Sequence, residues 1–224
     1  MTTSNSGFRM DGFAKINRIS RRDDGRVLVC LTVGNKSGSE DVEFLILDEL
    51  FDAILREVES GEISMDTVAM LDEYASVTAA FSSACSSLSF TQCSERALFR
   101  KLVAKGYSKN VCEAAIAIVI SRGYIDEVST AVRRAEIMVS KLWGRSRIFA
   151  KLCEEGFSDG AMEEVSAFLE DVDFVEGCVC VIRKKRVSVP VECREREKMY
   201  ASLSRLGYSS SEIKAAIGRI KSGE

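Results

Sequence analysis

A helix–turn–helix pattern occurs three times in this chain, and this repetition constrains the fold more than any other feature. The turns are Gly106-Tyr107-Ser108, Gly156-Phe157-Ser158 and Gly207-Tyr208-Ser209, spaced by 50 and then 51 residues. Apolar residues stand four, seven and eight positions before each glycine, on one face of a helix. The glycine suits a left-handed C-terminal cap, and the serine suits an N-cap of the next helix. Repeats of this length are typical of stacked helical modules that share a core.

The N-terminal segment has the two-residue period of β-strands instead. Alternating residues on both sides of Asp24-Gly25 predict a β-hairpin with its turn at these two residues. Val42–Leu47 is predicted as a third short strand. A helix is expected from Asp48 to near Gly61, and a second helix from Ser64 that extends to Ser87 or breaks near Ser82. A small β-containing cap therefore precedes the helices.

The helical part divides into repeats that we expect to hold three helices each. The first repeat takes its leading helix from residues 72–89, and the second repeat takes it from the stretch between Asp126 and Trp143. Residues 171–193 are rich in valine and contain Pro190, the chain's one proline, so an irregular or extended insertion is expected there. The predicted fold is mainly α, an elongated array of tandem three-helix repeats after a small N-terminal β-hairpin or three-strand element. The predicted domains are 1–63, 64–126, 127–170 and 171–224.

Composition argues against catalysis and against a metal site. The 224 residues include eight cysteines but no histidine and no Cys-x-x-Cys pair, so neither the usual base near neutral pH nor a common zinc motif is present. We find no phosphate-binding glycine loop, nucleophile elbow or spaced acidic metal set. Cys178 and Cys180 are the best redox candidates, although we favour the simpler explanation that they occupy alternate positions of a short strand or of an extended connection. We therefore expect no enzyme and no cofactor.

The sequence also indicates where the protein works. It has no apolar run long enough to span a membrane, and its first residues lack the apolar core of a signal peptide. A cytoplasmic protein without membrane contact is expected.

Charge is distributed unevenly along the chain. Residues 1–93 hold 8 basic and 15 acidic side chains, whereas residues 94–224 hold 23 basic and 19 acidic ones. The repeats are thus the basic part. Basic clusters attract phosphates and also acidic protein surfaces, and a solvated helix face remains an equally simple explanation for any one cluster.

Four segments together carry a resemblance to a known family. They are SERALFRKLVAKGYS, SRGYIDE, WGRSRIFAKLCEEGFSD and REKMYASLSRLGYSSSEI, and with the β-containing N-terminus they resemble the RecX family. The resemblance implies tandem three-helix units that bind along the groove of the RecA filament on single-stranded DNA. It also implies a modulator, usually an inhibitor, of RecA ATP hydrolysis and strand exchange in recombination, DNA repair and the SOS response.

The partner surface is expected among the clustered cations of the repeats. We expect a monomer that contacts RecA. Whether the basic clusters also contact single-stranded DNA directly is left open by the sequence. The competing function is a helical DNA-binding module that acts without RecA. Trp143, the one tryptophan, either stacks on a base or, as we favour, packs in the core. The candidate contact residues are Arg96, Arg100, Lys101, Lys105, Lys141, Arg145, Arg147, Arg183, Lys184, Lys185 and Arg186.

Overall fold

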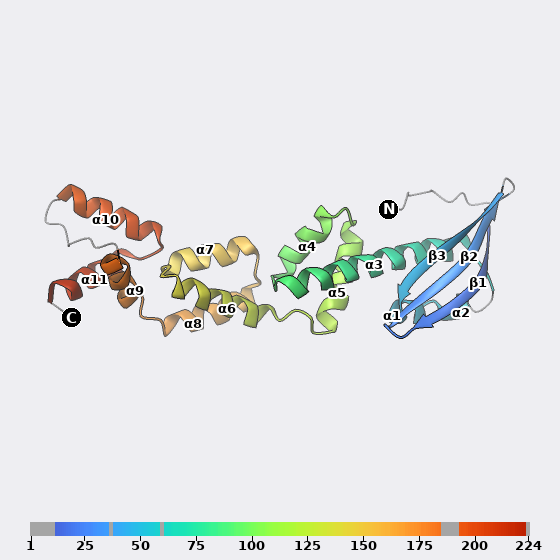
Figure 1. Ribbon diagram of the computed structural model, residues 1–224, viewed down its shortest axis with the longest axis horizontal. Coiled ribbons are helices and arrows are strands. Elements are labelled where there is room, and N and C mark those ends of the chain that lie inside the picture. The colour runs from blue at the N-terminus through green and yellow to red at the C-terminus, as the bar shows by residue number, and fades with distance from the viewer. Residues whose placement is uncertain (1–11, 36–37, 59–60, 185–192, 223–224) are drawn as a thin grey trace. The chain divides into compact units, whose positions relative to one another are not determined.

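The structure is a computed structural model that describes residues 12–35, 38–58, 61–184 and 193–222 (Figure 1). The chain forms two compact units. One comprises the residues up to Ser87 together with Lys101–Arg122, and the other comprises Leu88–Arg100 together with the residues from Gly123 onward. Each unit is mainly helical, and the first unit also contains a small sheet, as the sequence predicts.

The sheet of the first unit is antiparallel and has the strand order β3-β2-β1-β4. Its strands are β1 (Phe13–Arg22), β2 (Arg26–Asn35), β3 (Gly38–Leu47) and β4 (Glu62–Ile63). The predicted hairpin is confirmed, because Arg22 pairs with Arg26 and Gly25 adopts a φ of +74° in the turn. Strand β3 begins earlier than predicted, and the two-residue strand β4 was not predicted.

One face of the sheet forms a core with the helices that follow it. The buried members of this face include Val27, Val29 and Leu31, which pack with Phe51 and Leu71. The single helix expected from Asp48 is wrong, since the chain forms α1 (Asp48–Asp52) and α2 (Leu55–Val58) with a turn between them. In this turn the Ile54 amide donates to the Phe51 carbonyl at 3.0 Å, and the turn buries Ile54 to 2% exposure.

The helices of the first repeat match the repeat pattern. Helix α3 (Met65–Phe90) runs without a break past both predicted ends, and α4 (Glu95–Ala104) and α5 (Lys109–Ser121) follow it. Gly106 has a φ of +96°, and the Ser108 hydroxyl accepts the Val111 amide at 3.4 Å. The glycine cap and the serine cap predicted from the sequence are both present at this turn.

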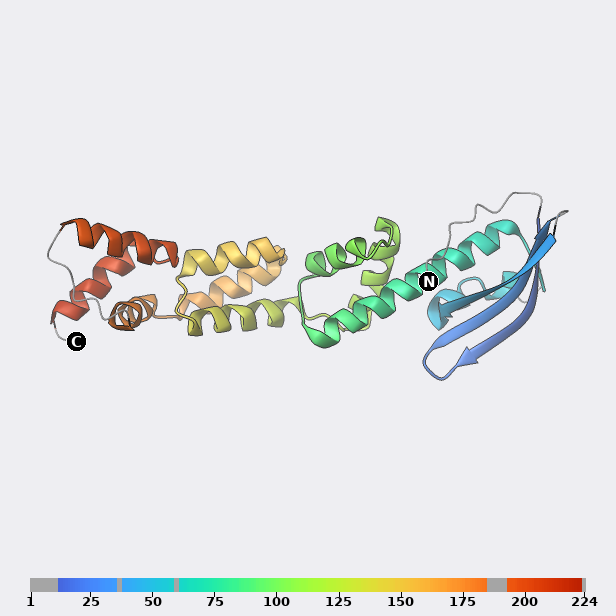
Figure 2. The same cartoon turned by 45° about the horizontal axis from the view of Figure 1, so that its top comes forward.

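The second unit contains the other two repeats around one shared core. The second repeat consists of α6 (Glu127–Ser140), α7 (Arg145–Glu155) and α8 (Asp159–Glu170), which lie side by side in Figure 2. The third repeat consists of α9 (Phe174–Lys184), α10 (Cys193–Arg205) and α11 (Ser210–Ser222). The buried residues Leu152, Leu169 and Leu203 belong to the common core.

Helix α9 corrects the expectation of an irregular or extended segment at 171–193. Residues Phe174, Cys178 and Ile182 follow one another at four-residue intervals and are buried at 5%, 0% and 3% exposure. Burial of this helical face outweighs the strand preference of its valines. Cys178 and Cys180 therefore lie on a helix, where residues two apart point to different faces. Pro190 and the residues around it lie outside the described part of the chain.

Candidate binding surface

Two of the predicted contact arginines join the first repeat's α4 to the second repeat's α7. The Arg100 guanidinium donates to the carbonyls of Glu154 at 3.5 Å and Glu155 at 3.1 Å. The Ser94 hydroxyl donates to the same Glu155 carbonyl at 2.7 Å. These donors satisfy carbonyls at the C-terminus of α7 and complement its negative end. The side chain of Arg96 packs over Gly156, where an added Cβ would lie 2.8 Å from its Cδ.

Glu127 completes this first joint from the start of α6. One of its carboxylate oxygens accepts the Glu95 amide at 3.1 Å, and the other accepts the Ser158 amide at 3.2 Å. The carboxylate thereby caps the N-termini of both α4 and α8. Burial, followed by repulsion from Glu127, raises the pKa of Glu95. The predicted Ser158 side-chain cap is absent from the described hydrogen bonds of α8, and Glu127 takes this place.

The second joint connects α7 to the third repeat through the backbone. The Gly144 amide donates to the Leu206 carbonyl at 2.8 Å, and the Ser146 amide donates to the Gly207 carbonyl at 3.2 Å. The Ser146 hydroxyl donates to the same Gly207 oxygen at 2.8 Å. A Cβ added to Gly144 would lie 2.2 Å from the Gly207 carbonyl carbon, so this approach requires glycine.

Arg145 and Arg147, also predicted to contact a partner, have internal contacts beside this joint. Arg145 donates to the Leu169 carbonyl at 2.7 Å and lies 5.4 Å from the Phe174 ring centroid. Arg147 stacks on Trp143 with 3.9 Å between its guanidinium carbon and the ring centroid. Trp143 is half-buried and packs against the core of the second unit. This placement agrees with the packing role that we favoured over base stacking.

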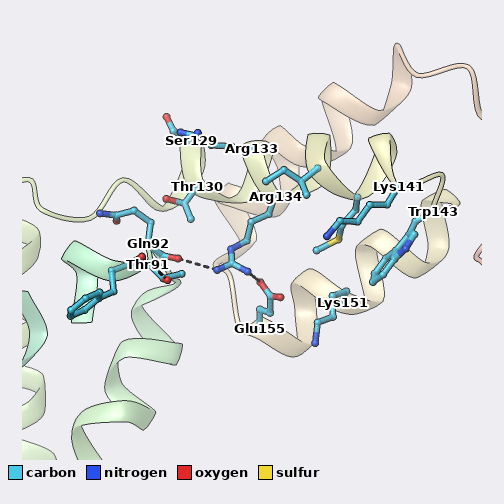
Figure 3. A pocket seen from close by; sticks show the side chains of 13 residues that line it. Thr91, Gln92, Ser129, Thr130, Arg133, Arg134, Lys141, Trp143, Lys151 and Glu155 are labelled. Carbon is cyan, nitrogen blue, oxygen red and sulfur yellow. Dashed lines mark hydrogen bonds and ion pairs between the residues drawn. The ribbon is translucent and has the colours of Figure 1, made fainter. Parts of the chain in front are cut away.

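A groove of about 730 Å³ opens beside these helices in the second unit (Figure 3). Lys141 lines it together with two cations that were not among the candidates, Arg133 and Lys151. Arg134 lies at its centre, where its guanidinium meets the Glu155 carboxylate at 2.9 Å and the Gln92 carbonyl at 3.0 Å. The sequence shows all three within a cluster of basic residues before the second turn. Their arrangement around one groove could not be predicted, because it depends on how α6 and α7 pack.

The remaining candidates lie at helix ends. Lys101 and Lys105 are exposed at the end of α4 in the first unit, and Arg183 and Lys184 are exposed at the end of α9 in the second. Lys185 and Arg186 lie outside the described residues. The described residues contain no cluster of acidic, cysteine and histidine side chains able to hold a metal ion. They also contain no helix that could span a membrane.

Comparison with known proteins gives a consistent set of relatives. No protein-family profile matches the sequence. Two curated proteins from Xanthomonas campestris pv. campestris, strains B100 and 8004, are each named "Regulatory protein RecX"; each is 28% identical over 124 residues, which is 55% of this chain and 76% of the relative.

Solved structures agree with this result at the level of the fold. A crystal structure of regulatory protein RecX matches with a TM-score of 0.71 at 19% identity, over 91% of this chain and 98% of the other. RecX from Lactobacillus salivarius matches with a TM-score of 0.57 at 20% identity, over 65% of this chain and 97% of the other. The helical repeats and the small sheet thus form a fold already known in crystals.

Proposed function

The chain belongs to the RecX family, and we propose that it binds the RecA filament on single-stranded DNA and inhibits the filament's ATP hydrolysis and strand exchange. In this role it would regulate recombination and DNA repair in the cytoplasm, without catalysis of its own. The observation that carries the proposal is the likeness in sequence to curated RecX proteins, together with the shared fold. The name of those relatives states only that they are regulatory.

The repeated joints support a filament-binding role on physical grounds. In the second unit, the start of one repeat's middle helix bonds to carbonyls at the C-terminal end of the next repeat's middle helix, through Ser94 in one case and Ser146 in the other. The same kind of joint thus recurs from repeat to repeat. Several weak contacts presented by successive repeats can engage a periodic partner together, which raises the overall affinity through effective concentration.

The predicted contact residues have different parts in this proposal. The exposed ends of α4 and α9, with Lys105 and Lys184, would contact the filament directly. Arg100 and Arg145 already donate to backbone carbonyls, so they would act as positioning residues within the second unit. Substitution of Lys105 or Lys184 should therefore change filament binding directly, whereas substitution of Arg100 or Arg145 should first change the packing of the second unit.

The test is RecA-catalysed ATP hydrolysis on single-stranded DNA with and without the purified protein. We expect inhibition at stoichiometric ratios, and we expect Lys105→Glu/Lys184→Glu to weaken it. The matched control is Lys198→Glu/Lys214→Glu, which reverses two exposed charges of α10 and α11 outside the candidate set. An unchanged hydrolysis rate would contradict the proposal. Salt-sensitive binding to bare DNA without any effect on RecA would favour the independent DNA-binding module instead.

A further inference from the structure

The groove on the second unit combines an apolar floor with a cationic rim. The floor includes Ile137, which is 46% exposed, and Met138 beside it on α6. Phe90, which is 89% exposed, and half-buried Trp143 line the groove as well. Two large apolar side chains as exposed as Phe90 and Ile137 in one groove are the kind of apolar surface that marks an interaction site.

The charge of the lining is strongly one-sided. Four lining residues are cationic, and the one acidic residue, Glu155, is neutralised by Arg134. Lys151 pairs with Glu154 at 2.9 Å on an exposed part of α7, which leaves its charge largely screened. Arg133 and Lys141 are exposed and form no ion pair with any other residue that the structure describes. The groove therefore complements a ligand that is both acidic and partly apolar.

We propose that this groove binds an extended acidic peptide segment of a partner protein, with an aliphatic or aromatic side chain seated on Ile137 and Met138 and carboxylates at Arg133 and Lys141. A single nucleic-acid strand fits the lining less well. Sequence-independent strand binding uses a series of open aromatic faces, whereas Arg147 already covers Trp143. The floor of the groove is aliphatic, with Ile137 and Met138 in place of open aromatic rings.

The protein provides its own probe, because Trp143 is its one tryptophan and lines the groove. Its fluorescence can be titrated with the peptide Ac-EDELFDED-NH2. Ac-EDESGDED-NH2, which keeps the charges but loses the apolar pair, and the oligonucleotide (dT)12 serve as comparisons. We expect saturable binding of the first peptide, weakened by salt, and at least about tenfold weaker binding of the second, which corresponds to loss of the buried apolar pair.

Two variants separate the groove from general attraction to a basic protein. Arg133→Glu/Lys141→Glu reverses the unpaired rim charges and should weaken the first peptide about tenfold. The control Lys198→Glu/Lys214→Glu changes the net charge equally on helices that do not line the groove and should leave binding within about twofold. Circular dichroism should be the same for both variants, because all four side chains are exposed.

The proposal is overturned if the two peptides bind equally, if both variants weaken binding equally, or if (dT)12 binds while neither peptide does. Absence of any saturable peptide binding would also overturn it. The proposal goes beyond the regulation of RecA and does not rest on it, since the titration contains no RecA. A failed ATP-hydrolysis test with successful peptide binding, or the reverse, would therefore identify which proposal is wrong.

Discussion

Replacement of Gly144 by alanine should destabilise the second unit through the joint between α7 and the third repeat. The new Cβ would lie 2.2 Å from the Gly207 carbonyl carbon and 2.4 Å from the Tyr208 amide nitrogen. Both are backbone atoms, so no side chain can move aside, and the two segments must separate. Overpacking of this kind costs about 1–3 kcal/mol.

The separation also weakens hydrogen bonds that cross the joint. The Gly144 and Ser146 amides and the Ser146 hydroxyl all donate to Leu206 or Gly207. Each hydrogen bond that is lost costs about 1 kcal/mol, and part of this network should be retained. Together with the overpacking, the total loss in the free energy of unfolding should be about 3 kcal/mol. The φ of Gly144 is −79°, which alanine adopts freely, so the effect is steric rather than a consequence of backbone strain.

Urea unfolding followed by Trp143 fluorescence measures this effect directly, since Trp143 adjoins the substituted residue. Gly160→Ala is the matched control. Gly160 lies in α8 with nothing within 4 Å of an added Cβ, so alanine there should be neutral or stabilising by up to about 1 kcal/mol. If Gly144→Ala changes the free energy of unfolding no more than Gly160→Ala does, the proposed close approach of the two segments is refuted.

Other parts of the second unit give predictions of smaller or different effect. Ser94→Ala removes the donor to the Glu155 carbonyl and the cap on the Ala97 amide, so urea unfolding should show a loss of about 1–2 kcal/mol; an unchanged midpoint would contradict the joint. Arg134→Met should cost about 1–2 kcal/mol, because it leaves the partly buried Glu155 carboxylate without its partner, and Glu155→Gln in the same background should recover part of the loss. Burial raises the pKa of Cys178 from 9.0 to about 11, so its contribution to stability is complete below pH 9 and is lost as the pH rises toward 11, because the unfolded thiol ionises first. Thiol labelling at pH 8 should therefore modify exposed Cys153 in the folded protein and reach Cys178 only after unfolding.

The repeat turns were predictable because their determinants are local. A glycine with positive φ and a serine at the next helix start follow from a few adjacent residues, and Gly106, Gly156 and Gly207 all adopt such a φ. Helix α9 was missed because local preference and tertiary burial disagree there. Its valines favour strands in isolation. Its apolar residues recur every four positions, and this helical face becomes buried only when it packs against α11.

The binding surface was less predictable than the fold because cations were judged by clustering along the chain. The acceptors of Arg100 and Arg145 are backbone carbonyls 55 and 24 residues away, which no sequence pattern marks. The groove likewise needs the end of α3 beside α6 and α7, since Phe90, Ile137 and Lys151 meet only in the folded unit. Basic composition located the relevant half of the chain, and packing decided which cations remain available.

This distinction changes how substitutions in the repeats must be interpreted. A charge reversal at Arg145 would remove the donor to the Leu169 carbonyl and the stacking on Phe174, so a loss of RecA inhibition would not by itself demonstrate a filament contact. Lys141 is exposed on the groove rim and its side chain makes no hydrogen bond or ion pair with the other described residues, so its reversal changes charge and little else. Arg100 and Arg145 are engaged by backbone carbonyls within the second unit, whereas exposed Arg133 and Lys141 carry charge that a partner can reach. A partner surface is therefore best mapped with variants of such exposed cations, and Arg100 and Arg145 are best tested first for stability.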